Sequence, residues 1–194
     1  MKLAFILAGV WLAYGIVHTL LASNKCKNLL KGILGRFFIY YRLIYNLIAF
    51  LLLIPILIWQ QQLPSEVILP TGTMNYILGG LMMTSGVYLA FISLKSYGFK
   101  DFLGLNALEG VEEKRVFKRD ELSEIVRHPL YLGILLFVWG NFGFSGTLVS
   151  CVTALSLTAY IRIGIYFEER KLVETFGSTY QKYQKEVPML IPRF

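Results

Sequence analysis

Long apolar runs constrain the fold of this 194-residue chain more than any other feature. Three of them, residues 3–22, 39–59 and 74–94, each approach the roughly 20 residues that an α-helix needs to cross a bilayer. A fourth run, residues 130–167, is too long for one crossing, and it contains turn-forming residues, namely Asn141, Gly143, Ser145 and Gly146. We therefore predict an all-α integral membrane protein with five transmembrane helices, the last two forming a helical hairpin over residues 129–167.

The composition supports a membrane environment. Hydrophobic residues make up 56% of the chain and charged residues only 16%. A water-soluble domain of this size could not hide so much apolar surface, because a large part of it must face solvent. Gly79, Gly80 and Gly86 in the third run suit close packing of membrane helices.

Basic residues gather in alternate connections and predict the orientation. The connections around residues 25–42 and 95–127 and the segment after residue 167 are rich in Lys and Arg, whereas residues 60–73 contain neither. The positive-inside rule then places the basic connections and the C-terminus in the cytoplasm and the N-terminus outside. This bias explains the net charge of +7, so no nucleic-acid partner is predicted. Cys26 and Cys151 are isolated, which predicts neither a disulfide nor a metal site.

Polar chemistry is concentrated in the C-terminal half. We predict a single domain in which residues 1–94 form a three-helix scaffold. Residues 95–194 form the catalytic part, with a cytoplasmic connection, the hairpin and a C-terminal cytoplasmic helix. Both ends of a helical hairpin lie at the same membrane face. One predicted pocket therefore contains residues from before and after it: Arg127, His128, Tyr131, Glu168 and Glu169.

Each candidate has a structural alternative. The two glutamates could be only a solvated helix end, and Arg127 could only anchor its helix at the headgroups. His18 is expected to form a hydrogen bond between helices. Arg162 could reach the headgroups, or it could face the pocket and bind an anionic substrate group. Residues 95–114 are a candidate lid over the site.

Two motifs identify a resemblance. Arg-His-Pro-Leu-Tyr-Leu-Gly (127–133), followed by an apolar hairpin, resembles the signature of the isoprenylcysteine carboxyl methyltransferase family and the related phospholipid methyltransferases. Glu168-Glu169 and the later block of Leu172, Phe176-Gly177, Tyr180, Tyr183 and Val187-Pro188 resemble its C-terminal motif. The resemblance covers roughly residues 115–194, and the size suits a small prokaryotic member. The chain departs from the family at Glu121 and Ser123, where a Gly and an aromatic residue are common.

The resemblance implies S-adenosylmethionine as the methyl donor, bound on the cytoplasmic side without a Rossmann domain, and S-adenosylhomocysteine as the product. Carried onto this chain, it implies cofactor contacts from Arg115, Val116, Phe117, Lys118, His128, Pro129, Leu130, Tyr131, Glu168 and Glu169. Glu168 would also be catalytic. Arg162 would join it as the replacement for a substrate-binding Arg of the eukaryotic enzymes, which falls near Gly164.

The acceptor expected from the resemblance is a lipid-like substrate, with the isoprenylcysteine α-carboxylate as the first choice. Residues 97–105 resemble a segment of bacterial thiol S-methyltransferases, so thiol S-methylation is an alternative, as is N-methylation of a phospholipid. A membrane transporter or structural subunit is the alternative from another class. Against it, the apolar runs lack the broken helices usual in transporters.

Overall fold

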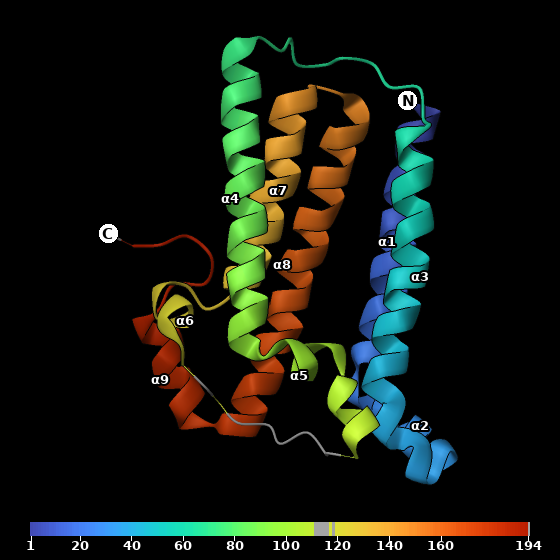
Figure 1. The fold of residues 1–194 in the computed structure, drawn as a ribbon, viewed down its shortest axis with the longest axis vertical. Helices are drawn as coiled ribbons and strands as arrows, with labels where there is room; N and C mark the ends of the chain where they lie inside the picture. Colours follow the sequence, from blue (N-terminus) through green and yellow to red (C-terminus); the bar gives the residue numbers. More distant parts are fainter. Residues whose placement is uncertain (111–116, 118, 194) are drawn as a thin grey trace. The chain divides into compact units, whose positions relative to one another are not determined.

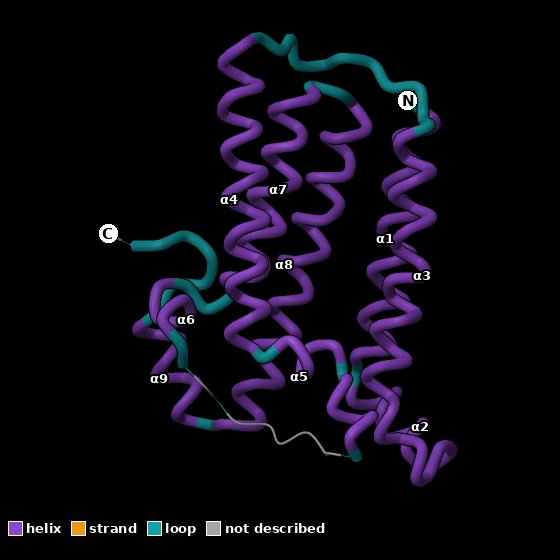
Figure 2. Tube along the Cα trace, in the orientation of Figure 1, coloured by secondary structure: helices purple, strands orange, loops and turns teal. Residues whose placement is uncertain are grey.

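The structure is a computed structural model that describes residues 1–110, 117 and 119–193. Its described residues are mostly helical, with an isolated antiparallel bridge between Val67 and Thr147 (Figures 1 and 2). This confirms the all-α prediction. The chain forms two compact units that alternate along the sequence, residues 1–64 with 97–115 and residues 65–96 with 116–194. The predicted division into a scaffold and a catalytic part stays a prediction.

The first unit contains two antiparallel apolar helices and shorter pieces around their ends. Its elements are α1 (Lys2–Ala22), α2 (Asn24–Leu34), the 3-10 helix η1 (Gly35–Tyr40), α3 (Tyr41–Gln61), α5 (Phe99–Leu103) and the 3-10 helix η2 (Leu105–Glu109). Tyr45 Oη lies 2.6 Å from His18 Nε2, which confirms the hydrogen bond expected between the first two membrane helices.

The segment after α4 (Thr73–Tyr97) is fastened to α3 within this first unit. The Phe102 carbonyl accepts hydrogen bonds from Arg42 Nε at 3.2 Å and Asn46 Nδ2 at 3.0 Å. Gly104, with φ +79°, ends α5 so close to α3 that a Cβ there would lie 2.7 Å from Leu43 N. The idea that residues 95–114 form a lid stays a prediction.

The second unit is built on a helical hairpin. It contains α4 (Thr73–Tyr97), α6 (Glu121–Ile125), α7 (Pro129–Ser145), α8 (Leu148–Phe176) and α9 (Ser178–Glu186). Tyr97, the last residue of α4, is counted with the first unit. The turn between α7 and α8 falls at Gly146, whose φ is +65°, and the Thr147 side chain caps α8 by accepting from Ser150 N. The predicted hairpin, with a short first arm of 17 residues, is therefore confirmed.

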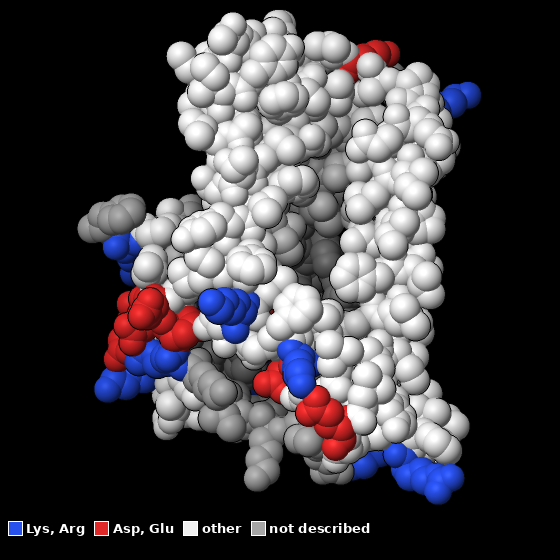
Figure 3. Space-filling model, viewed as in Figure 1, with Lys and Arg blue, Asp and Glu red and all other residues white. Residues whose placement is uncertain are grey.

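The apolar elements match the predicted membrane helices. By length and composition α1, α3 with the preceding α2, α4 and α8 can each cross a bilayer, and α7 is apolar but shorter. Figure 3 shows α3 and α4 almost free of charged side chains along their visible faces. At 1.5 Å per residue the 29-residue α8 is about 44 Å long, more than the hydrocarbon thickness of about 30 Å. Its charged last part, residues 168–176, therefore extends beyond the hydrocarbon.

Glycines bring α4 and α7 into backbone contact. A Cβ on Gly86 would lie 2.5 Å from Gly133 O, and one on Gly79 would lie 2.7 Å from Gly140 O. Gly80 faces open space. Among the described contacts, Gly79 and Gly86 therefore pack against α7, and Gly80, the third glycine predicted for packing, does not. Such close approach favours association of helices in lipid, where apolar burial alone contributes little.

Gly86→Ala is expected to lower the melting temperature of the detergent-purified protein by several degrees, because its methyl group must push α4 and α7 apart. Gly80→Ala, on the same helix with open space around it, is the matched control. It should be neutral or slightly stabilising, since Ala is the better helix former. Equal melting temperatures for the two variants would contradict the glycine contact.

Candidate functional site

The two ends of the hairpin meet at a buried cluster of charges. Arg127 Nε donates to Glu169 Oε1 at 2.6 Å, and His128 Nε2 lies 3.2 Å from the same oxygen. Gln184 Nε2, from α9, donates to the other oxygen of Glu169 at 3.0 Å. The side chains of Arg127 and Glu169 are only 8% and 11% exposed. Glu169 therefore joins α8, α9 and the start of α7.

The local sequence explains how the start of α7 is held in place. Pro129 occupies the first turn of α7, where its missing N–H costs no hydrogen bond, and His128 before it has a non-helical backbone conformation. Arg127 N and His128 N donate to the carbonyls of Pro188 and Met189, at 2.9 and 3.1 Å. Arg127 Nη1 donates to Gln184 O and Val187 O. Arg127 is thus a buried clamp for the C-terminal segment and not the headgroup anchor weighed from the sequence.

Glu169 is held in its ionised form. Burial alone would raise the pKa of its carboxyl, but hydrogen bonds from His128 and Arg127 and their positive charge outweigh burial and lower the pKa to about 2. Since an ionised carboxylate only accepts, the short contact to His128 requires the proton on Nε2.

Glu168, the next residue, has a different environment. Its side chain is 43% exposed. Tyr131 Oη donates to Glu168 Oε2 at 2.8 Å, and His128 Nδ1 lies 4.0 Å from the same oxygen. The His128 and Tyr131 rings are stacked, with centroids 5.5 Å apart and planes at 25°. The second oxygen, Glu168 Oε1, has no hydrogen bond from the described residues, so it is available to a ligand.

Aromatic packing supports this cluster from the side of α9. Tyr180, Tyr183 and Val187 form a buried core against which Phe117 packs. Tyr183 Oη donates to Ser123 O at 2.5 Å, and burial raises the pKa of the Tyr183 hydroxyl. The Ser96 hydroxyl donates to Asp120, which caps α6. These contacts connect α4, α6 and α9 around the start of α7.

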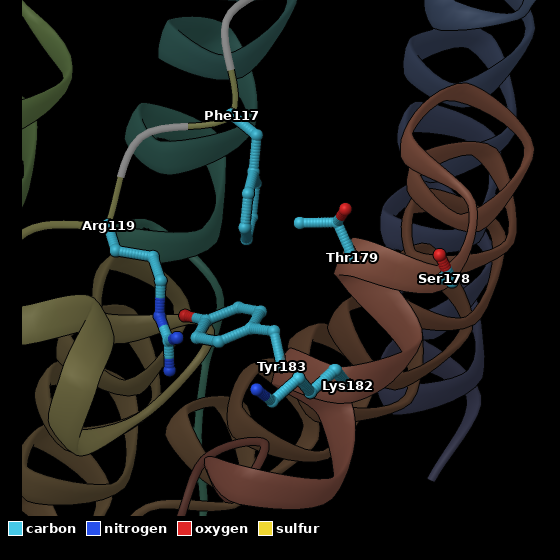
Figure 4. A pocket seen from close by; sticks show the side chains of 6 residues that line it. All are labelled: Phe117, Arg119, Ser178, Thr179, Lys182 and Tyr183. Atoms are coloured by element: carbon cyan, nitrogen blue, oxygen red, sulfur yellow. The ribbon is translucent and has the colours of Figure 1, made fainter.

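A hollow of about 690 Å³ lies beside this aromatic core (Figure 4). In Figure 4 the Arg119 side chain reaches toward the Tyr183 ring, and its guanidinium carbon lies 4.7 Å from the ring centroid. The hollow is lined by Phe117, Arg119, Ser178, Thr179, Lys182 and Tyr183. Of the residues predicted to bind the cofactor, Phe117 is therefore the one found among the described residues that line this hollow.

The remaining predicted residues are placed as follows. Leu130 is half-buried in the first turn of α7, next to the buried Pro129. Arg162 is exposed on α8, with Nη1 2.8 Å from Met189 Sδ, and it is not joined by a described contact to Glu168. The stretch implied by the resemblance lies mostly outside the described residues, namely Arg115, Val116 and Lys118.

Two contributors were missed by the sequence analysis. Gln184 binds Glu169 through its side chain, and Ser123 offers its carbonyl to Tyr183. Ser123 was noted only as a departure from the family pattern, and a backbone contact gives no signal in side-chain type. Gln184 could have been found from its position four residues after Tyr180 and one after Tyr183 on one short helix. Within the described part of the chain, His, Cys, Asp and Glu form no group of three suited to a metal ion.

The fold and the cluster define a class: a multi-pass helical membrane protein with a polar site at one end of a helical hairpin. Comparison with known proteins agrees with this class. The chain is 38% identical over 155 residues to methanethiol S-methyltransferase 2 of Bradyrhizobium diazoefficiens, covering 77% of this chain and 58% of that protein. It is 36% identical over 138 residues to methanethiol S-methyltransferase of Pseudomonas deceptionensis, covering 70% and 49%.

A shorter match joins the chain to the family named from its motifs. It is 36% identical over 74 residues to protein-S-isoprenylcysteine O-methyltransferase of Schizosaccharomyces pombe, covering 38% of this chain and 31% of that protein. These matches support the isoprenylcysteine carboxyl methyltransferase-like family that was predicted from the motifs. It spans about half the length of the curated relatives it matches. No family model and no solved structure matches it.

Proposed function

We propose that this chain is an S-adenosylmethionine-dependent membrane methyltransferase whose acceptor is a small thiol. The observation that carries the proposal is the half-exposed Glu168 carboxylate, held by Tyr131 beside His128, where the family motifs meet. The thiol acceptor rests on the comparisons. Two methanethiol S-methyltransferases match 70% or more of this chain, whereas the prenylcysteine enzyme matches 38%. The isoprenylcysteine carboxylate, first choice from the motifs, becomes the second candidate.

The residues fit the proposed cofactor. S-adenosylmethionine carries a ribose diol, an ammonium group and a sulfonium. Glu168 Oε1 can accept hydrogen bonds from hydroxyls or an ammonium group, and the stacked faces of His128 and Tyr131 attract a cation. Glu169, saturated by three donors, is assigned to positioning His128 rather than to direct contact. Pro129 and Leu130 would shape the start of α7, and the roles of Arg115, Val116, Phe117 and Lys118 stay as the resemblance implies.

When bound, the cofactor supplies an electrophilic methyl group for direct displacement by the acceptor. The chain has to align the acceptor and exclude water, since ionised groups react faster when they are not solvated. A thiol must lose its proton first. His128 Nδ1 can take that proton, because Nε2–H is fixed on Glu169, and the resulting imidazolium would lie between two carboxylates. A carboxylate acceptor would need no base, and Arg162 would then be the candidate to hold it.

Side-by-side methyl transfer from labelled S-adenosylmethionine tests the acceptor. The purified protein in detergent is given a small alkyl thiol, a farnesylated cysteine analogue or phosphatidylethanolamine. We expect label in the volatile thioether product and little in the lipids. Methylation of the prenylcysteine alone would replace the thiol by the second candidate. No methylation, with no calorimetric binding of S-adenosylhomocysteine to folded protein, would favour the transporter or structural alternative.

A further inference from the structure

The helix between the first two membrane helices is separate from both of them. The Ser23 side chain ends α1 and caps α2 by accepting from Cys26 N at 3.2 Å. Gly35, with φ +50°, ends α2, which is 11 residues long. Figure 1 shows α2 turning away from the direction of α1 and α3, at the end where these helices are joined. Because both neighbours cross the bilayer, α2 begins and ends at the membrane surface.

The α2 helix is amphipathic, and part of its apolar side faces outward. Leu29 and Ile33, one turn apart, are 67% and 70% exposed, and Phe37, in η1 beyond the break at Gly35, is 54% exposed. Lys27, Asn28 and Lys31 occupy the opposite side of the helical wheel. Three large exposed apolar side chains so close in the chain would be unfavourable in water, but they suit the boundary between headgroups and acyl chains.

The charge of this region has one sign. Residues 1–65 contain no Asp or Glu, whereas the part from Lys25 to Arg42 holds five basic residues. Arg36 lies over the Phe37 ring, with its guanidinium carbon 5.0 Å from the centroid, so a cation lies beside one of these apolar side chains. Such a surface is complementary to an anionic partner, and the partner adjacent to it is the bilayer.

We propose that α2 lies in the plane of the membrane interface and binds the phosphate groups of anionic phospholipids. Leu29, Ile33 and Phe37 insert among the upper acyl chains. The cations Lys25, Lys31 and Arg36 contact the headgroups. Each basic residue near an anionic surface favours binding by roughly fivefold, so three of them give a clear selectivity over zwitterionic lipid. This inference does not depend on the proposed methyl transfer.

Lipid-dependent thermal stability tests the charges. The protein in detergent micelles is titrated with phosphatidylglycerol or phosphatidylcholine, and its melting temperature is followed. We expect phosphatidylglycerol to raise it further than phosphatidylcholine does. The triple variant Lys25→Gln/Lys31→Gln/Arg36→Gln should lose this difference. The charge-matched control Lys95→Gln/Lys185→Gln/Arg193→Gln, exposed positions outside α2, should keep it. An equal difference in both triple variants would overturn the proposal.

Depth measurements test the orientation with single substitutions, so they do not depend on the triple variant folding. Spin labels are attached at Ile33→Cys or Asn28→Cys in a Cys26→Ser/Cys151→Ser background, and the protein is placed in phosphatidylglycerol nanodiscs. Oxygen dissolved in the acyl region should broaden the Ile33 label. A water-soluble nickel chelate should broaden the Asn28 label. Equal exposure of both labels to the nickel chelate would show that α2 stands in water, against the proposal.

Discussion

Arg127→Met is expected to lower the melting temperature of the purified protein by roughly 10 °C. The substitution leaves the Glu169 carboxylate buried without its guanidinium partner, which costs about 3–5 kcal/mol for a buried pair. In a chain of this size each kcal/mol corresponds to about 2–4 °C. The Gln184 and Val187 carbonyls lose a donor in the same variant, so the C-terminal segment is released from the start of α7. Thermal unfolding in detergent measures the effect.

Arg170→Met is the matched control. Arg170 lies on the same helix as Glu169 and pairs with Glu174 at 3.9 Å, but both side chains are about two-thirds exposed. An exposed pair of this kind contributes between zero and about 1 kcal/mol, so its loss should be barely measurable. Adding Glu169→Gln to Arg127→Met should restore part of the stability by removing the unpaired charge. Variants of Arg127 and Arg170 that melt within 2 °C of each other would refute the buried pair.

Topology made the convergence of the site predictable. A hairpin returns the chain to the face from which it started, so a motif before residue 129 and one after residue 167 must meet. Arg127 and His128 were placed beside Glu169 on this argument alone, and the hydrogen bonds between them agree with it. The lengths of α1, α3 and α4 could be predicted from the apolar runs, because the thickness of the bilayer fixes how many residues a crossing needs.

The detailed environment of each side chain could not be predicted. Glu168 and Glu169 are 100° apart on α8, and nothing in their sequence says which one faces the packed interior. Hydrogen bonds from Gln184 and Arg127 select Glu169 as the inward carboxylate, and these bonds depend on how α9 folds back. Likewise Gly79 and Gly80 are equivalent as residues, but only Gly79 meets α7. Composition predicts that such contacts exist, and tertiary packing decides which residues make them.

Glu168→Gln is expected to weaken binding of S-adenosylhomocysteine by about 10- to 100-fold while leaving the melting temperature almost unchanged. A carboxylate that accepts from a ligand hydroxyl or ammonium contributes about 1.5–3 kcal/mol, and the isosteric amide loses the charge-assisted part. Because Glu168 is 43% exposed, its replacement leaves no buried charge unpaired. Calorimetric titration of detergent-purified protein measures the affinity, and a parallel thermal scan establishes that the variant is folded.

Glu169→Gln, one residue along the same helix, is the contrasting variant. It removes the charge that holds Arg127 and His128, so stability and affinity should fall together. The two neighbouring substitutions thus separate a ligand-binding carboxylate from a positioning one. If folded Glu168→Gln bound S-adenosylhomocysteine as tightly as the unaltered protein, the outward carboxylate would not be the cofactor contact. The site would then have to be sought elsewhere in the second unit, first in the hollow beside Phe117 and Tyr183.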